Sequence, residues 1–265
     1  MVQKPITNNN NCVFVWGDSQ MYYGLDVSLL EDRLDMQVLT SAHAGSGMYD
    51  FLVSEKNIPN NHVCIVSFPE CALLRNPSSD YNRTGYELSC LQMLFLAGCP
   101  KQECLRIEKM NRGNIVYQAF GNNYGIFAYA DSLECEREPI SFWQSFFKER
   151  NEWYNWKAQS YKEGIKSLFN KHSQIVLIQF PFDKQVESFA QNSIDRYLTD
   201  SLKRELIDNY AMKYDTIVLQ SDSLLMHDFS HLNEVGARLL TAEIADILRA
   251  DTVNNCFIEV QIQSR

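Results

Sequence analysis

The sequence predicts an α/β protein in which about five parallel strands lie between two layers of helices, a three-layer α/β/α sandwich. Short apolar runs such as Cys12–Trp16 and His62–Phe68 have the pattern of strands that are buried on both faces. These runs alternate with segments of helical spacing, which is typical of a parallel sheet covered on both sides. With 265 residues, of which 45% are hydrophobic, the chain is long enough for one large domain with its own core.

The strands and helices are expected in a regular order. The expected strands are 12–16, 36–40, 62–68, 174–180 and 215–220. Pro69 and Pro181 end the third and fourth strands, because proline cannot donate to a strand ladder. The expected helices are 27–34, 48–56, 85–97, 142–169 (one or two helices), 186–210 and 233–249. Apolar residues gather on one side of the last helix, as they do on a helix that packs against a sheet.

We interpret residues 12–250 as a single domain. The stretch 111–170 is long for one connection between strands, and we expect it to be a helical insertion that shapes the substrate side. Residues 251–265 are a C-terminal extension. Within the extension, apolar and polar residues alternate from Ile258 to Gln263, which predicts an added edge strand.

Charge and cysteine usage exclude several kinds of protein. Lys and Arg number 24 and Asp and Glu 33, a net charge of −9, and an acidic surface repels nucleic acid and anionic membranes. The eight cysteines include no C-x-x-C pair, so we expect reduced thiols and no zinc site. No secretion signal, membrane-length apolar stretch or glycine-rich phosphate loop is recognisable. We therefore expect a cytoplasmic protein with no cofactor, no metal, no nucleic-acid partner and no membrane segment.

The first candidate segment follows the first expected strand. Gly17, Asp18 and Ser19 stand where that strand gives way to a helix, and sites in parallel α/β sheets form at the carboxyl ends of strands. A serine at a helix start has a free backbone N–H beside its hydroxyl. By itself, the segment is explained more simply by Ser19 acting as a helix N-cap, which is a common role for serine.

The second candidate segment precedes the last expected helix. Asp228 stands three residues before His231, so one turn can bring its carboxylate to the imidazole and leave the other ring nitrogen to take a proton from a hydroxyl. The alternative is a helix cap made by Asp228 or Ser230, with His231 on the surface. His227 and His231 are four residues apart, but spacing places no third metal ligand. If both segments face one end of the sheet, Ser19, His231 and Asp228 form a nucleophile, a base and an orienting group.

The two segments resemble the SGNH/GDSL superfamily of esterases and acyltransferases. The first block of that family is similar to Gly17-Asp18-Ser19, and its last block, Asp-x-x-His-Leu-Asn, is similar to Asp228–Asn233. The resemblance covers most of the chain, from Val13 to Leu248. It implies a flavodoxin-like α/β/α fold, and it assigns the roles of nucleophile, base and orienting group to Ser19, His231 and Asp228.

The resemblance also implies an oxyanion hole. The backbone N–H of Ser19 is one donor, and the second block of the family supplies another from a glycine, for which Gly45 is the best match. One such donor is typically worth about 10²–10³ in rate. The third block of the family, Gly-x-Asn-Asp, is missing. The third strand ends in Ser67-Phe68-Pro69-Glu70 instead, and Asn76, with Arg75 beside it, is the nearest candidate for the third donor.

The Tyr23-Gly24-Leu25-Asp26 element is similar to one branch of the family, whose members acylate cell-surface polymers. We therefore expect an O-acetyltransferase or O-acetylesterase that acts on a carbohydrate or polysaccharide. A transferase would need an acyl donor such as acetyl-CoA. The aromatic run 143–156 is interpreted as core or as a sugar-stacking wall. The missing third-block Asn leaves a second hypothesis open, a catalytically weak or inactive module that binds glycan or protein.

Overall fold

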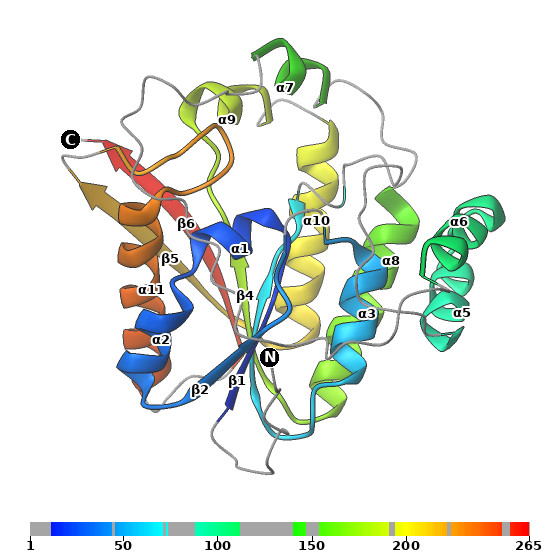
Figure 1. Cartoon of the computed structure of the whole chain (residues 1–265). Helices are drawn as coiled ribbons and strands as arrows, with labels where there is room; N and C mark the ends of the chain where they lie inside the picture. Colours follow the sequence, from blue (N-terminus) through cyan, green and yellow to red (C-terminus); the bar gives the residue numbers. More distant parts are fainter. Residues whose placement is uncertain are drawn as a thin grey trace.

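The computed structural model describes residues 12–43, 46–70, 73, 88–111, 140–146, 154–190, 194–221, 224–250 and 255–264. In this part of the chain, six strands form one parallel sheet in the order β2-β1-β3-β4-β6-β5 (Figure 1). The strands are β1 (Cys12–Trp16), β2 (Gln37–Thr40), β3 (Val63–Ser67), β4 (Gln174–Gln179), β5 (Lys213–Ser221) and β6 (Cys256–Ser264). The predicted α/β class with a parallel sheet is confirmed, with six strands instead of about five.

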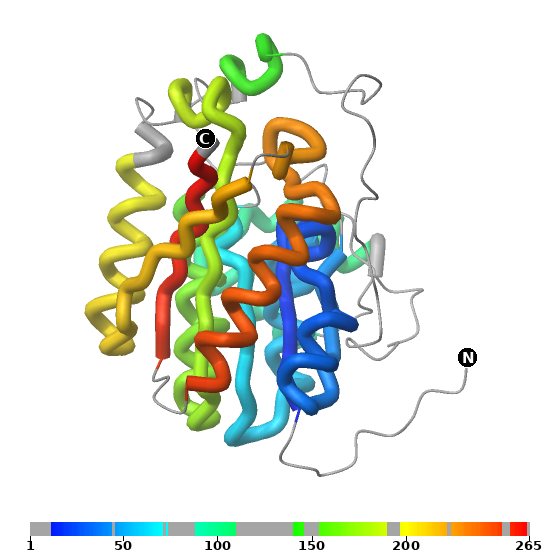
Figure 2. Tube along the Cα trace, turned by 90° about the vertical axis from the view of Figure 1, so that its left-hand side faces the viewer, coloured from blue at the N-terminus to red at the C-terminus, as the bar shows by residue number. Residues whose placement is uncertain are grey.

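Helices cover both faces of the sheet. One face carries α1 (Ser19–Gly24), α2 (Val27–Leu34) and α11 (Glu234–Arg249), which pack together. The other face carries α3 (Met48–Lys56), α8 (Tyr154–Asn170) and α10 (Ile194–Asn209), with α5 (Leu88–Leu96) and α6 (Lys101–Asn111) outside α3 and α8. The short helices α7 (Ile140–Phe146) and α9 (Lys184–Ala190) lie beyond the carboxyl ends of the strands, at the top of Figures 1 and 2.

Strand β1 shows why the strand sequences are apolar without interruption. Phe14 and Trp16 belong to the core cluster on the side of α3 and α8, whereas Val13 and Val15 belong to the cluster on the side of α2 and α11. Each of the four is at most 1% exposed. Successive side chains leave a strand on opposite faces, so a strand with helices on both sides must be apolar at every position.

Strand β6 corrects the prediction of an added edge strand. It lies between β4 and β5 and pairs with both, so the edges of the sheet are β2 and β5. Ile258 and Val260 are buried in the cluster on the α11 side. On the opposite face, Glu259 forms an ion pair with Lys203 of α10 and accepts a hydrogen bond from the Tyr214 hydroxyl at 2.7 Å. Apolar and polar residues alternate along β6 because Glu259 makes polar contacts on one face of the sheet. The alternation does not mean that β6 lacks a neighbouring strand on one side.

The predicted insertion 111–170 includes a helix that belongs to the sandwich. Tyr161, Ile165 and Leu168 of α8 are fully buried, and α8 packs along α3 and leads into β4. Parallel neighbours such as β3 and β4 need a crossover of this kind. The rest of the stretch, 112–139 and 147–153, lies outside the described residues. Trp143, Tyr154 and Trp156 are buried, so these aromatic side chains belong to the core.

Six cysteines lie in the described part of the chain, and none of these six is in a disulfide. Burial raises the pKa of Cys64 to about 12 and that of Cys256 to about 11, so both stay protonated and act as small core residues. Across the same residues, no helix combines the length and the apolarity that crossing a bilayer requires. In the described ranges, no three His, Cys, Asp or Glu side chains lie close enough together to hold a metal ion.

Replacing Ile258 with Ala should lower the free energy of unfolding by about 2–5 kcal/mol, because Ile258 is fully buried in the middle of the sheet. Ile262→Ala is the matched control, since Ile262 lies on the same face of β6 and is only half-buried. It should cost about half as much or less. Urea unfolding followed by circular dichroism measures both. Equal, small losses for the two variants would contradict an internal position for β6.

Candidate active site

Ser19 is the first residue of α1 and follows closely on β1. The turn between strand and helix requires Gly17, because a Cβ at that position would overlap the side chain of Met21. Asp18 caps the helix, since its carboxylate accepts a hydrogen bond from the backbone N–H of Gln20 at 3.1 Å. Ser19 is therefore not the N-cap, and its hydroxyl is left for another partner.

Asp228 and His231 lie on the loop between β5 and α11. The loop folds back on itself, and the N–H of His227 donates to the carbonyl of His231 at 2.9 Å. One carboxylate oxygen of Asp228 accepts hydrogen bonds from the backbone N–H groups of Ser230 at 2.7 Å and His231 at 2.8 Å. The cap of α11 is Asn233. Neither Asp228 nor Ser230 is the helix cap that the sequence allowed as an alternative.

Ser19 and His231 meet although they are 212 positions apart in the chain. The Oγ of Ser19 lies 2.9 Å from Nε2 of His231, and Nδ1 of His231 lies 2.7 Å from Oδ2 of Asp228. Helices α1 and α11 pack against each other, and the side-chain amide of Gln20 donates to the carbonyl of Ser230 at 3.0 Å. The structure thus brings the three predicted side chains together and ties their two segments side by side.

The surroundings of Asp228 hold it as a carboxylate. Burial raises its pKa, but the hydrogen bond and the charge of His231, together with the N–H groups of Ser230 and His231, outweigh burial and lower the pKa to about 2. The side chains of His231 and Asp228 are only 18% and 24% exposed. A carboxylate at Nδ1 keeps the proton on that nitrogen, so Nε2 is the atom that accepts the hydroxyl proton of Ser19.

Two further residues of α1 support the imidazole. The Tyr23 ring packs edge-to-face on the His231 ring, with centroids 5.5 Å apart and planes at 82°. Burial, with smaller contributions from Tyr22 and Asp228, raises the pKa of the Tyr23 phenol, which therefore stays neutral. Gln20 holds the loop through its bond to Ser230. The sequence analysis named Tyr23 only as part of the Tyr23–Asp26 element and gave neither residue a role at the imidazole, although Tyr23 stands one helical turn after Ser19.

The donors expected for an oxyanion hole are described only in part. Gly45 and Asn76 both lie outside the described residues. The backbone N–H of Ser19 is in the first turn of α1, where N–H groups have no acceptor within the helix. The N–H of His43 donates to the carbonyl of Gly17 at 3.2 Å. The segment that leads to Gly45 therefore starts beside the turn that carries Ser19.

A buried carboxylate stands at the position where the third oxyanion donor was expected. Glu70 is 2% exposed and accepts a hydrogen bond from the side-chain amide of Gln179 at 3.0 Å. A carboxyl group can donate to an oxyanion only in its protonated form. The contact that the structure shows is to Gln179, and it ties the end of β3 to β4.

The arrangement of Ser19, His231 and Asp228 has the parts needed to remove a hydroxyl proton while the oxygen attacks an electrophile. No protein-family model matches this chain, and no curated protein matches it either. The function is therefore inferred from the geometry of the site and from the motifs that build it.

Replacing Asp228 with Asn should change the way stability depends on pH. The pKa of Asp228 is about 2 in the folded protein, below the ordinary 3.8, so the ionised carboxylate stabilises the fold above about pH 4 and this contribution is lost as the pH falls toward about 2. The variant should be less stable than wild type by about 2 kcal/mol at neutral pH, and the difference should shrink in acid. Urea unfolding of both proteins over a pH series measures it. A difference that is the same at every pH would contradict the depressed pKa.

Proposed function

We propose that this protein is a serine-dependent acyl-transfer enzyme that works through an acyl-Ser19 intermediate. The observation that carries the proposal is the hydrogen-bonded line from Asp228 through His231 to Ser19, with contacts of 2.7 Å and 2.9 Å. A serine hydroxyl is a weak nucleophile at neutral pH, and an imidazole oriented by a carboxylate activates it. The resemblance of both motifs to the SGNH/GDSL superfamily supports the same function.

In the first half of the proposed reaction, Nε2 of His231 takes the hydroxyl proton of Ser19 while Oγ attacks the carbonyl carbon of an ester. The charge that develops on the imidazole is balanced by Asp228, whose pKa of about 2 keeps it ionised. His231 then gives the proton to the leaving oxygen, and the tetrahedral intermediate collapses to acyl-Ser19. The N–H groups of Ser19 and Gly45 are the proposed oxyanion donors.

In the second half, His231 removes a proton from the incoming hydroxyl while that oxygen attacks the acyl carbon. The bond from the acyl carbon to Oγ of Ser19 then breaks, and His231 returns the proton to Oγ. Water as the incoming molecule makes the protein an esterase, and a sugar hydroxyl makes it an O-acyltransferase. We propose O-acetyl chemistry on a carbohydrate or polysaccharide, with a donor such as acetyl-CoA for a transferase and a cytoplasmic place of action before the glycan is exported. The resemblance of Tyr23–Asp26 to the polymer-acylating branch supports this substrate class.

A catalytically weak module that binds glycan or protein is the second candidate function. Glu70 favours it, because a buried hydrogen-bond acceptor occupies the position of the third oxyanion donor. The two candidates differ in one property that is simple to measure, the reactivity of the Ser19 hydroxyl.

The wild-type protein should hydrolyse p-nitrophenyl acetate and react with a fluorophosphonate probe. Ser19→Ala should lower turnover by about 10³-fold or more and abolish labelling, because it removes the attacking oxygen. His231→Ala should lower turnover by a similar factor, and the double variant should be no slower than either single variant, since the residues act as a unit. Mass spectrometry of the labelled peptide locates the adduct.

Ser141→Ala is the matched control, because Ser141 is an exposed serine on α7, and it should keep full activity. Labelling at another serine, or a Ser19→Ala variant as active as wild type, would rule out Ser19 as the nucleophile. A wild-type protein that is folded by circular dichroism and does not react with the probe would favour the binding module.

A further inference from the structure

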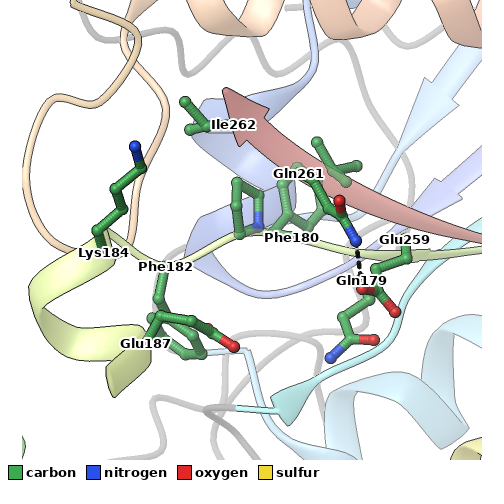
Figure 3. A pocket seen from close by; sticks show the side chains of 10 residues that line it. Gln179, Phe180, Phe182, Lys184, Glu187, Glu259, Gln261 and Ile262 are labelled. Atoms are coloured by element: carbon green, nitrogen blue, oxygen red, sulfur yellow. Dashed lines mark hydrogen bonds between the residues drawn. The ribbon is translucent and has the colours of Figure 1, made fainter. Parts of the chain in front are cut away.

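A cavity of about 180 Å³ lies beside the ends of β4 and β6 (Figure 3), but its walls are already paired or packed. The Gln261 amide donates to the Glu259 carboxylate at 3.0 Å, drawn as a dashed line in Figure 3, and Glu259 also pairs with Lys203. Phe180 and Phe182 are buried in the core. A larger hollow of about 440 Å³ lies between α5 and α6, and its walls are open to solvent.

The groove between α5 and α6 is lined by large apolar side chains that face solvent. Phe95 and Leu96 of α5 are 56% and 84% exposed, and Leu105 of α6 is 52% exposed. The opposite side of α5 holds the pair of helices to the core, because Cys90 and Leu94 are fully buried. The pair stands at the outer edge of the molecule, beyond α3 and α8 (Figure 1). An exposed apolar groove of this kind marks an interaction surface.

The lining residues have the spacing of a helix–helix interface. They recur three or four positions apart on each helix, which gathers them in one stripe. Helices α5 and α6 are joined by four residues and pack together, so two such stripes lie side by side. A second pair of helices laid on these stripes completes a four-helix bundle. The stripes include Leu88, Leu91 and Phe95 on α5 and Lys101, Leu105 and Glu108 on α6.

The charged residues of the groove are arranged symmetrically. Lys101 and Glu108 both lie on α6, two helical turns or about 10.5 Å apart. A two-fold axis that crosses α6 halfway between them sets Lys101 of one copy opposite Glu108 of the other, and the same pair forms again at the other end. The groove is therefore complementary in charge to a second copy of itself in an antiparallel arrangement.

The same axis also suits α5. On α6 it passes between Cys104 and Leu105, about one turn after the connection that joins the two helices, and Gln92 of α5 lies about one turn before that connection. Because the rise is about 1.5 Å per residue, these points lie at nearly the same level. The axis therefore crosses α5 near Gln92 and sets Leu88 of one copy opposite Leu96 of the other. Apolar side chains meet along α5, while opposite charges meet along α6.

We propose that the groove between α5 and α6 binds the same groove of a second copy of this chain, so that two pairs of helices pack antiparallel as a four-helix bundle about a two-fold axis. A two-fold contact requires a patch that is complementary to itself, and the order of charged and apolar residues in the groove meets this requirement. Nine described residues line the groove, fewer than the roughly 20–30 on each side of a standard interface. We therefore expect a dissociation constant in the micromolar range.

Sedimentation equilibrium of the full chain, at micromolar to millimolar concentrations, should show monomers in equilibrium with dimers. Lys101→Glu alone, or Glu108→Lys alone, sets like charges opposite each other at both ends of the interface and should weaken the dimer about 10-fold or more. A mixture of the two single variants should dimerise as wild type does, because opposite charges meet again, and so should the double variant. Association is measured without turnover, so the result is independent of the proposed function.

Lys109→Glu is the matched control, because Lys109 is an exposed residue of α6 that does not line the groove and the substitution changes the net charge as Lys101→Glu does. It should dimerise as wild type does, whereas Leu96→Glu should abolish association. Circular dichroism checks that each variant is folded. A wild type that stays monomeric, as it would if a different protein covered the groove, overturns the inference. So does a dimer that survives Leu96→Glu, or a double variant as weak as the single ones.

Discussion

The packing of α1 against α11 is the constraint on which the candidate site depends. Strand β5, which precedes α11, lies at one edge of the sheet, and β6, β4 and β3 separate it from β1, which leads into α1. Polar contacts hold α11 against the turn between α1 and α2, since Thr241 of α11 accepts a hydrogen bond from the Asp26 backbone N–H at 2.9 Å and Arg238 lies 3.2 Å from the Asp26 carboxylate. Because all strands of a parallel sheet end at the same rim, the hydroxyl of Ser19 and the imidazole of His231 are presented at one level.

The inserted strand β6 is the second organising feature of the fold. Lys203, only 12% exposed at its side chain, contacts both Gln179 and Glu259, and these two residues are register partners on β4 and β6. A shift of β6 by one residue would turn Glu259 to the apolar face beneath α11. A buried ion pair is weak evidence for stability because desolvation opposes it, but this one marks a single register. The same register leaves the far end of β6 paired with β5 alone among the described strands.

The elements and the identity of the three central residues of the site were predictable from the sequence because both depend on local pattern. Continuous apolar runs such as Cys12–Trp16 can be buried only between two helical layers. The sequence could not predict which of two adjacent residues takes a given role when both residues suit it. Asp18 and Ser19 are both good N-cap residues, and only the structure shows that Asp18 caps α1 and leaves the hydroxyl of Ser19 to His231.

By itself, the sequence determined that this chain forms a parallel α/β sandwich and that a serine near its start, with an aspartate and a histidine near its end, belongs to one set. Only the tertiary structure decided that Gln20 and Tyr23 support the imidazole and that β6 lies inside the sheet. The physical reason is that hydrophobic periodicity and capping preferences act over a few residues, whereas strand order and side-chain contacts across the sheet depend on packing summed over the whole chain.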